Sequence, residues 1–171
     1  MGYWTKIAAL AMLLGAALAA PARAQDRKVP YWAMLRYDEV RMRVGPSDEY
    51  PIAWVYKRRG LPVRVVRVRE GWRLVEDPDG TRGWIAESQL LRERGAVVIG
   101  AGLAEVRAEP AAAGRLKWRA EPGALARLLR CREAWCEVDF ARGAERARGV
   151  SLKGWVARGR LWGSEDLPGD R

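Results

Sequence analysis

The sequence predicts an all-β protein made of two small β-barrels in tandem, preceded by an export signal. Three observations support this prediction: short strand-like segments separated by glycine and proline turns, one pattern of glycines and tryptophans that occurs twice, and an apolar run near the N-terminus. Short strands punctuated by turn residues are typical of barrels and sandwiches. Helical periodicity is weak, and residues 87–92 alone suggest a single helical turn between the two halves.

Residues 1–24 have the pattern of a secretory signal peptide. An uninterrupted apolar run occupies residues 7–20 and follows Lys6. It is shorter than the roughly 20 residues that a membrane-spanning helix needs. Ala22-Arg23-Ala24 supplies the small-x-small pattern of a cleavage site. We therefore expect cleavage after Ala24, no transmembrane segment in the mature protein, and a periplasmic or secreted location.

The first half contains strand patterns in close succession. Residues 61–65 alternate apolar and charged side chains, and residues 66–68 continue with the parity shifted, which predicts a bulge. A turn at residues 70–71 then leads into a strand at 72–75. This order is that of a β-hairpin, so we expect the two strands to pair.

A second hairpin follows directly. Residues 77–80 (Asp-Pro-Asp-Gly) form a strong turn signal, in which Gly80 is free to adopt positive φ. The segment 83–85 begins the next strand. In the second half, residues 125–129 and 135–140 have the same strand character.

Four landmarks recur in the same order in both halves. They are Pro46, Gly60, Trp72 and Trp84 in the first half, and Pro110, Gly123, Trp135 and Trp155 in the second. The landmark glycine precedes the next tryptophan by 12 residues in both halves. The two tryptophans are 12 residues apart in the first half and 20 in the second. The extra residues fall around 141–149, a segment of loop-like composition, where insertion costs little. The repeat indicates a tandem duplication.

The repeat and the N-terminal pattern together divide the chain into four parts. We expect a signal peptide at residues 1–24, a first barrel at 25–93, a second and more divergent barrel at 94–163, and a C-terminal tail at 164–171.

The two cysteines predict a structural disulfide. Cys131 and Cys136 are separated by four residues, as expected for a pair that faces across a hairpin. In an oxidising compartment such a pair usually becomes a disulfide. A redox-active pair would typically be Cys-x-x-Cys in a βαβ context, and neither feature is present.

The composition argues against most catalytic chemistry. The chain has no histidine, which removes serine–histidine and cysteine–histidine nucleophile pairs and zinc sites that use imidazole. We therefore expect no catalytic residue, no metal site and no cofactor. A carboxylate hydrolase is the remaining enzymatic alternative, and Glu76, Asp77 and Asp79 are its candidate acids, although they lie at a turn tip.

The chain is strongly basic. It has 31 Lys and Arg residues against 21 Asp and Glu, a net charge of +10, which favours acidic partners. Export argues against nucleic acid as that partner. The alternative is compositional bias, because arginine far outnumbers lysine and alanine is abundant. The densest basic run, Lys57-Arg58-Arg59, is either a solvated loop or a source of weak attraction to anionic envelope surfaces.

The motifs of the first half resemble those of the bacterial SH3 (SH3b) domain family. They are Arg41-x-Arg43-x-Gly45-Pro46-Ser47, Gly60, Gly71-Trp72-x-x-Val75 and Asp79-Gly80-x-x-Gly83-Trp84-Ile85. Residues 50–63 are similar to a group of exported SH3-like proteins of alphaproteobacteria. The second half resembles the other half of that group through Glu121-Pro122-Gly123, Cys131, Trp135-Cys136, Gly154-Trp155-Val156 and Leu161-Trp162-Gly163. The resemblance covers residues 31–163 and implies two SH3-like barrels that bind ligands rather than catalyse reactions.

The resemblance also implies a shallow groove beside the tryptophan hairpin. Aromatic faces can stack there on extended peptides or sugars, and arginines can pair with carboxylates. The ligand-binding candidates are Arg43, Tyr50, Tyr56, Arg58, Arg59, Trp72 and Trp84. Trp84 and its repeat equivalent Trp155 also suit the core, whereas Trp72 and Trp135 suit a groove better. Trp135 also lies beside the expected disulfide, which favours a structural role for it. The second repeat has Glu109 where the family has a glycine, so we expect the groove in the first barrel.

Taken together, these patterns predict a non-enzymatic, exported SH3-like binding module. Its expected partner is a peptidoglycan peptide or another component of the cell envelope. The alternative is an adaptor that anchors or regulates a separate envelope enzyme.

Overall fold

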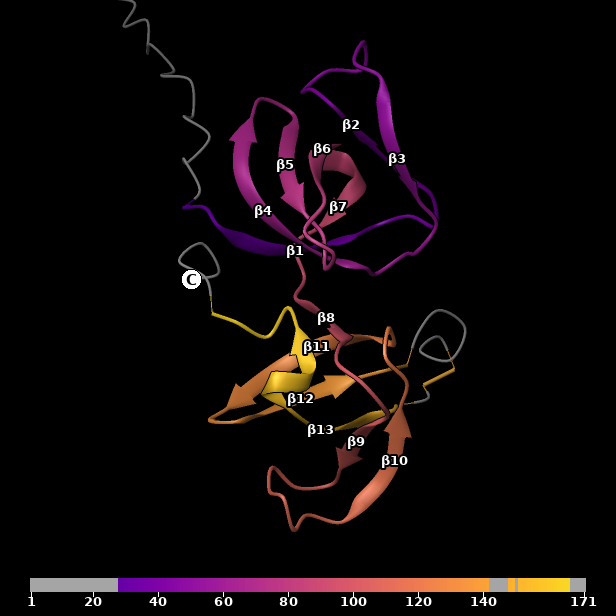
Figure 1. The fold of residues 1–171 in the computed structure, drawn as a ribbon, viewed down its shortest axis with the longest axis vertical. Coiled ribbons are helices and arrows are strands. Elements are labelled where there is room, and N and C mark those ends of the chain that lie inside the picture. Colours follow the sequence, from indigo (N-terminus) through magenta and orange to yellow (C-terminus); the bar gives the residue numbers. More distant parts are fainter. Residues whose placement is uncertain (1–27, 142–147, 150, 167–171) are drawn as a thin grey trace, which may run out of the picture.

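The computed structural model describes residues 28–141, 148–149 and 151–166, which form two β-barrels stacked end to end (Figure 1). The expected signal peptide with its cleavage site, most of the insertion and the last five residues lie outside the described residues. Each barrel is one antiparallel seven-stranded sheet, and the helical segments within the described residues are two single 3-10 turns. The predicted all-β fold with two tandem barrels is confirmed.

The two sheets have the same strand order. The first is ordered β3-β2-β6-β5-β4-β1-β7 and the second β10-β9-β13-β12-β11-β8-β14. The first contains β1 (Tyr31–Leu35), β2 (Val40–Arg43), β3 (Ile52–Tyr56), β4 (Pro62–Arg69), β5 (Trp72–Glu76), β6 (Arg82–Ala86), η1 (Glu87–Gln89) and β7 (Leu90–Leu91). The second contains β8 (Gly95–Val98), β9 (Ala104–Arg107), β10 (Leu116–Ala120), β11 (Leu125–Arg132), β12 (Trp135–Asp139), β13 (Lys153–Ala157), η2 (Arg158–Arg160) and β14 (Leu161–Trp162).

The predicted bulge and helical turn are both present, with small differences in extent. The register of β4 against β5 shifts between Val65 and Arg67, and β11 has an equivalent shift between Leu128 and Arg130. The helical turn covers only Glu87–Gln89, because the chain enters β7 at Leu90.

Apolar residues from the second barrel extend the core of the first. Val97 and Leu125 belong to the same buried cluster as the first-barrel strands, and Trp162 packs against it. The rings of Trp32 and Trp162 meet edge to face at 4.6 Å, and Trp32 Nε1 donates a hydrogen bond to the backbone oxygen of Glu165 at 2.8 Å. The barrels therefore share a packed joint.

The first barrel closes where β2 meets β6, at the residue pair Arg43–Trp84. Gly83 precedes this tryptophan and is buried. A Cβ atom at position 83 would lie 2.5 Å from Cγ of Met42, closer than atoms can approach. Because the glycine has no side chain, Met42 fills the core directly beneath the crossing.

The second barrel closes in the same way, at the pair Arg107–Trp155 between β9 and β13. Gly154 precedes the tryptophan. A Cβ atom there would overlap Cγ1 of Val106 and would lie 3.1 Å from the backbone oxygen of Arg107. Both barrels thus need a glycine at the same structural position for steric reasons.

We expect Gly83→Ala and Gly154→Ala each to lower the free energy of unfolding by about 1–3 kcal/mol, the usual cost of overpacking. Gly154→Ala should cost more, because Val106 is stiff and β-branched whereas Met42 can adapt. Urea unfolding followed by tryptophan fluorescence measures both. Gly159→Ala is the control, since a Cβ atom there would have no neighbour within 4 Å. An equal effect of all three substitutions would contradict the steric argument.

The predicted disulfide between Cys131 and Cys136 is present, with an S–S distance of 2.06 Å. The two residues are paired across the β11–β12 hairpin. In the first barrel the equivalent pair across β4 and β5 is Val68 and Arg73. The two repeats therefore hold the same hairpin position by different chemistry.

Arg73 is almost completely buried, and its guanidinium N–H groups form hydrogen bonds within the protein. Its Nε donates to Tyr31 Oη at 3.1 Å, and its Nη1 donates to the backbone oxygens of Arg69 at 3.1 Å and Trp72 at 2.9 Å. Its Nη2 is 2.5 Å from Glu87 Oε1. A buried guanidinium is tolerated only when it is paired in this way. The arginine ties the hairpin to η1.

We expect Cys131 and Cys136 to resist thiol labelling in unreduced, denatured protein. Replacing both by alanine should lower the free energy of unfolding by about 2 kcal/mol, the amount expected for closing so short a loop. Labelling by a fluorescent maleimide, with and without reductant, checks the bond. Two labelled thiols per chain without reductant would contradict it.

The predicted turn at residues 77–80 is held by one carboxylate. Asp77 Oδ1 accepts hydrogen bonds from the N–H groups of Asp79 at 3.0 Å and Thr81 at 2.8 Å. Its Oδ2 accepts from the hydroxyl of Tyr56 at 2.9 Å. Gly80 has the expected positive φ, 83°.

Glu76 lies between two arginines just before this turn. Arg82 Nε donates to its carboxylate at 2.6 Å, and Arg64 forms a second ion pair with it. Burial acts to raise the pKa of Glu76, but the hydrogen bonds from Arg82 and Arg64 outweigh it and hold the pKa below its usual value. The candidate acids Glu76 and Asp77 thus have structural partners.

The lowered pKa of Glu76 predicts a pH-dependent contribution to stability. Its ionised form should stabilise the fold above the unfolded-state pKa of about 4.3, and this stabilisation should be lost as the pH falls through the lower folded-state pKa. Glu76→Gln should therefore be less stable than the parent at neutral pH, with a gap that narrows in acid. Urea unfolding at about pH 7 and about pH 3 measures the gap. A gap that stays constant would contradict the argument.

Candidate functional site

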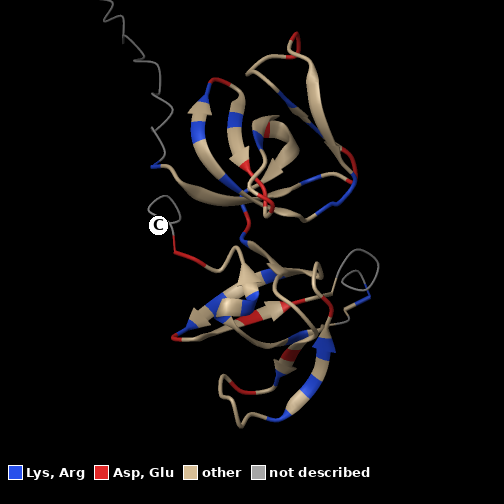
Figure 2. Cartoon of the chain, viewed as in Figure 1, with Lys and Arg blue, Asp and Glu red and all other residues tan. Residues whose placement is uncertain are grey.

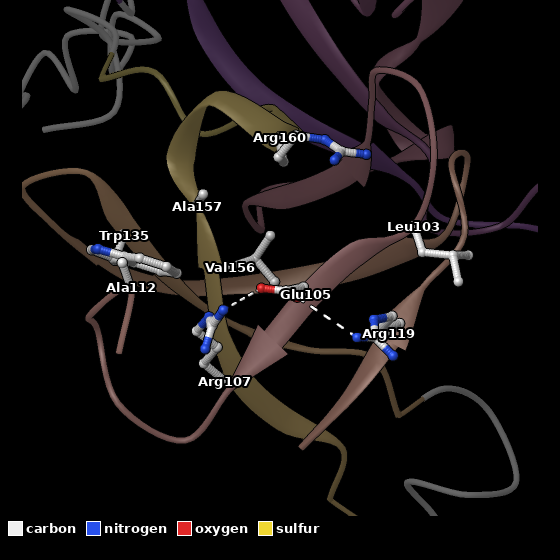
Figure 3. Close-up of a pocket in the computed structure, with 9 residues that line it drawn as sticks. All are labelled: Leu103, Glu105, Arg107, Ala112, Arg119, Trp135, Val156, Ala157 and Arg160. Atoms are coloured by element: carbon white, nitrogen blue, oxygen red, sulfur yellow. Dashed lines mark hydrogen bonds and ion pairs between the residues drawn. The ribbon is translucent and has the colours of Figure 1, made fainter. Parts of the chain in front are cut away.

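The second barrel carries a groove with a volume of about 610 Å³. Strands β9, β10, β12 and β13 supply its walls, with contributions from η2 and two loops (Figure 3). Its lining consists of Leu103, Glu105, Arg107, Ala112, Arg119, Trp135, Val156, Ala157 and Arg160. It is an open site with one aromatic wall and three arginines.

Charge is arranged around a single acid in this groove. Glu105 forms an ion pair with Arg107 and approaches Arg119 with an oxygen–nitrogen distance of 3.8 Å (Figure 3). Arg107 Nη1 also donates to the backbone oxygen of Gly114 at 2.5 Å, which fixes its guanidinium. Arg160 contributes a third positive charge. The formal charge of the lining is therefore positive, with Glu105 holding two of the arginines in place.

At the other end of the groove, backbone oxygens hold the side chain of Arg160 in place. Arg160 Nε donates to the backbone oxygen of Ile99 at 2.8 Å, and its Nη2 donates to that of Gly102 at 2.7 Å. Trp135, half-buried at the start of β12, lies across the groove from Leu103 (Figure 3). A flat ring and fixed arginines together can hold an extended chain that carries carboxylates.

Two of the first-barrel candidates lie in the core. Tyr56 and Trp84 are 6% and 9% exposed, so neither ring offers a face to a ligand. Tyr56 is buried because it lies on the interior side of β3 at the end of that strand. Trp84 is buried at the residue pair where the barrel closes. Burial, followed by the hydrogen bond to Asp77, raises the pKa of Tyr56.

The other candidates lie at the surface but have varied partners. Arg43 donates to the backbone oxygen of Tyr50 at 2.7 Å and pairs with Asp48 at 3.2 Å. Arg58 donates to the backbone oxygen of Gly123 at 2.6 Å, across the joint between barrels. Arg59 is exposed, Tyr50 is 46% exposed and Trp72 is half-buried. A binding role for these residues stays a prediction.

The groove residues that the sequence reasoning missed have equivalents in the first repeat. Arg107 corresponds to the candidate Arg43, since both pair with the closing tryptophan of their barrel. Aligning the two repeats and transferring the candidate Arg43 to its equivalent position would have identified Arg107. Arg119 stands where the first barrel has Val55, and no repeat signal marks that difference.

A smaller cavity of about 300 Å³ lies in the first barrel beside the buried Arg73. Because Tyr31, Glu87 and two backbone oxygens accept its hydrogen bonds, the arginine serves the fold there. Within the described residues, no group of three or more acids and cysteines is placed to hold a metal ion. None of the helical turns in this part of the chain has the length or apolar character to cross a membrane.

Solved structures with a detectable likeness include two proteins of Trichomonas vaginalis. NlpC2 is 11% identical, with 78% of this chain and 48% of that chain covered and a TM-score of 0.33. NlpC1 is 12% identical, with 81% and 47% covered and a TM-score of 0.33. The chain spans about half the length of these two structures. A search of curated proteins gave no match.

A family model described as the bacterial SH3 domain matches residues 36–91 and 100–163. The two matches coincide with the two repeats, and together they span most of the sequence. They also fall on the two sheets of identical strand order. The chain therefore belongs to the bacterial SH3 domain family.

Proposed function

We propose that this protein is a non-enzymatic, exported binding module, and that the groove of its second barrel binds an extended, carboxylate-bearing peptide of the cell envelope. Peptidoglycan stem peptides have this chemistry, and bacterial SH3 domains often bind peptidoglycan. The observation that carries the proposal is the placement of Arg107, Arg119 and Arg160 around a groove walled by Trp135.

The geometry of the groove suits a peptide with negative charges. Arginine pairs with carboxylates through two parallel hydrogen bonds, which gives direction as well as attraction. The carboxylate of Glu105 occupies the position between Arg107 and Arg119 that a ligand carboxylate would approach. The half-buried Ala157, beside Trp135 in the lining, suits short side chains such as alanine.

Export and domain boundaries complete the proposal. The signal pattern of residues 1–24 and the similarity to exported alphaproteobacterial proteins support secretion, as does the Cys131–Cys136 disulfide, since such bonds persist in oxidising compartments. Bacterial SH3 domains occur in extracellular or envelope proteins. We assign the mature barrels to residues 25–93 and 94–163, with a tail at 164–171.

Co-sedimentation of the purified protein with isolated sacculi tests the proposal. We expect binding that survives physiological salt and weakens about tenfold for Trp135→Ala, a loss typical of a central contact residue. Arg119→Val, which introduces the first-barrel residue, should weaken binding similarly. Arg127→Val is the matched control, because Arg127 is 46% exposed and pairs with Glu93 outside the groove lining.

Three results would contradict the proposal. Binding that disappears at physiological salt would mean only general charge attraction. An equal loss of sacculus binding for Arg119→Val and Arg127→Val would mean that the groove is not the binding site. No binding to sacculi at any salt would favour the adaptor, and a co-purifying envelope protein should then be found.

A further inference from the structure

Strand β3 of the first barrel is an open edge covered with apolar side chains. It pairs with β2 alone among the described strands. Trp54 is 57% exposed, Ile52 45% and Val55 39%, and the adjoining Tyr50 and Val44 are 46% and 59% exposed. Single exposed apolar residues are ordinary, but a contiguous set usually marks an interaction site. We call these five residues the β3 edge.

The second barrel provides an internal comparison. Its equivalent edge strand, β10, carries Lys117 and Arg119 where β3 has Ala53 and Val55. Figure 2 shows the contrast, since β10 is banded with basic residues while β3 is free of charge along its length. Charged residues on an edge strand prevent pairing with other chains. Both strands have a register shift at the same place. The two edges therefore share one backbone pattern and differ in their side chains.

The backbone of β3 is also available for pairing. Val55 lies opposite Arg41 of β2. The N–H of Arg41 donates to the side chain of Gln89 at 3.2 Å and so points away from β3. This makes Arg41–Val55 a non-hydrogen-bonded pair of the antiparallel ladder, in which the N–H and C=O of Val55 point outward. A further strand could accept and donate hydrogen bonds there.

The charges at the two ends of β3 indicate what that strand is. Asp48 and Glu49 precede β3, and the basic residues 57–59 follow it. A second copy of β3, running antiparallel about Trp54, brings Glu49 of each copy opposite Arg59 of the other. The sequence is therefore complementary to itself about a two-fold axis.

We propose that β3 pairs with β3 of a second copy, so that the protein forms a symmetric dimer through a continuous sheet. Trp54 of the two copies then packs across the axis on one face, and Ile52 and Val55, which lie opposite Arg43 and Arg41 of β2, pack on the other. The contact uses the same surface on both copies and covers the open edge of β3 in each. No third copy can therefore add to it, and the assembly stops at a dimer. The edge of β10, with Lys117 and Arg119, does not take part.

Sedimentation equilibrium of the purified protein over a range of concentrations tests the dimer. The variant Ala53→Lys with Val55→Arg copies the charges of β10 onto β3, and we expect it to raise the dimer Kd about tenfold or more. The control, Val68→Lys with Leu129→Arg, adds the same charge at exposed positions of inner strands β4 and β11. It should leave the Kd unchanged, and equal thermal melting of both variants shows that they fold.

A charge exchange tests the antiparallel arrangement. Glu49→Lys should weaken the dimer, as should Lys57→Glu with Arg59→Glu, whereas the three substitutions together should restore it. Arg58 is left intact because it contacts Gly123 across the joint. A protein that is monomeric at every concentration would overturn the proposal. So would a Kd insensitive to the β3 charges, or a combined variant that fails to recover.

The dimer and the groove can fail independently. Trp135→Ala lies in the second barrel and should leave the dimer Kd unchanged. Loss of sacculus binding with the dimer intact would therefore count against the groove alone, and a monomer that still binds sacculi would count against the dimer alone.

Discussion

The closing contact between the glycine-tryptophan strand and the arginine strand is the constraint on which each barrel depends. Among the described residues, β9 and β13 are paired in the ladder at Arg107 and Trp155, and Gly154 allows the two backbones to approach there. This contact sets Arg107 beside Trp155 and turns its guanidinium toward Glu105. The groove is thus a direct product of barrel closure, since its central ion pair lies on the strand that completes the barrel.

Duplication gave two equal backbones, and side-chain changes have given them different surfaces. The hairpin position held by Arg73 in one barrel is held by Cys136 in the other. The strand residue that is Val55 in one barrel is Arg119 in the other. The first change affects how the fold is stabilised, and the second decides whether a surface is apolar or basic. One architecture therefore carries two kinds of surface chemistry.

The sequence was informative about the fold because local patterns determine it. The parity shift at Val66, the turn ending at Gly80 and the spacing of the two cysteines each correspond to a feature seen in the structure. The bounds of β1 and β8 were not evident, because their almost continuous burial gives no alternation to read.

The groove was less accessible to sequence reasoning, because it depends on contacts between strands. Glu105 and Arg119 approach each other only through the β9–β10 register, which includes a shift that sequence does not reveal. The burial of Tyr56 was also hard to predict, because it depends on how β3 pairs within the sheet. Its aromatic ring suggested a ligand platform, yet β3 directs it inward and leaves Trp54 at the surface.

The shared joint has a consequence for how the two barrels can act together. Trp162 packs against the ring of Trp32 and against a core cluster that includes Val97, so the barrels are not linked by a flexible tether. A flexible linker raises the effective concentration of a second site over a range of distances, whereas a rigid one does so only for a matching spacing. A ligand that contacts both barrels would therefore have to match one fixed spacing between them.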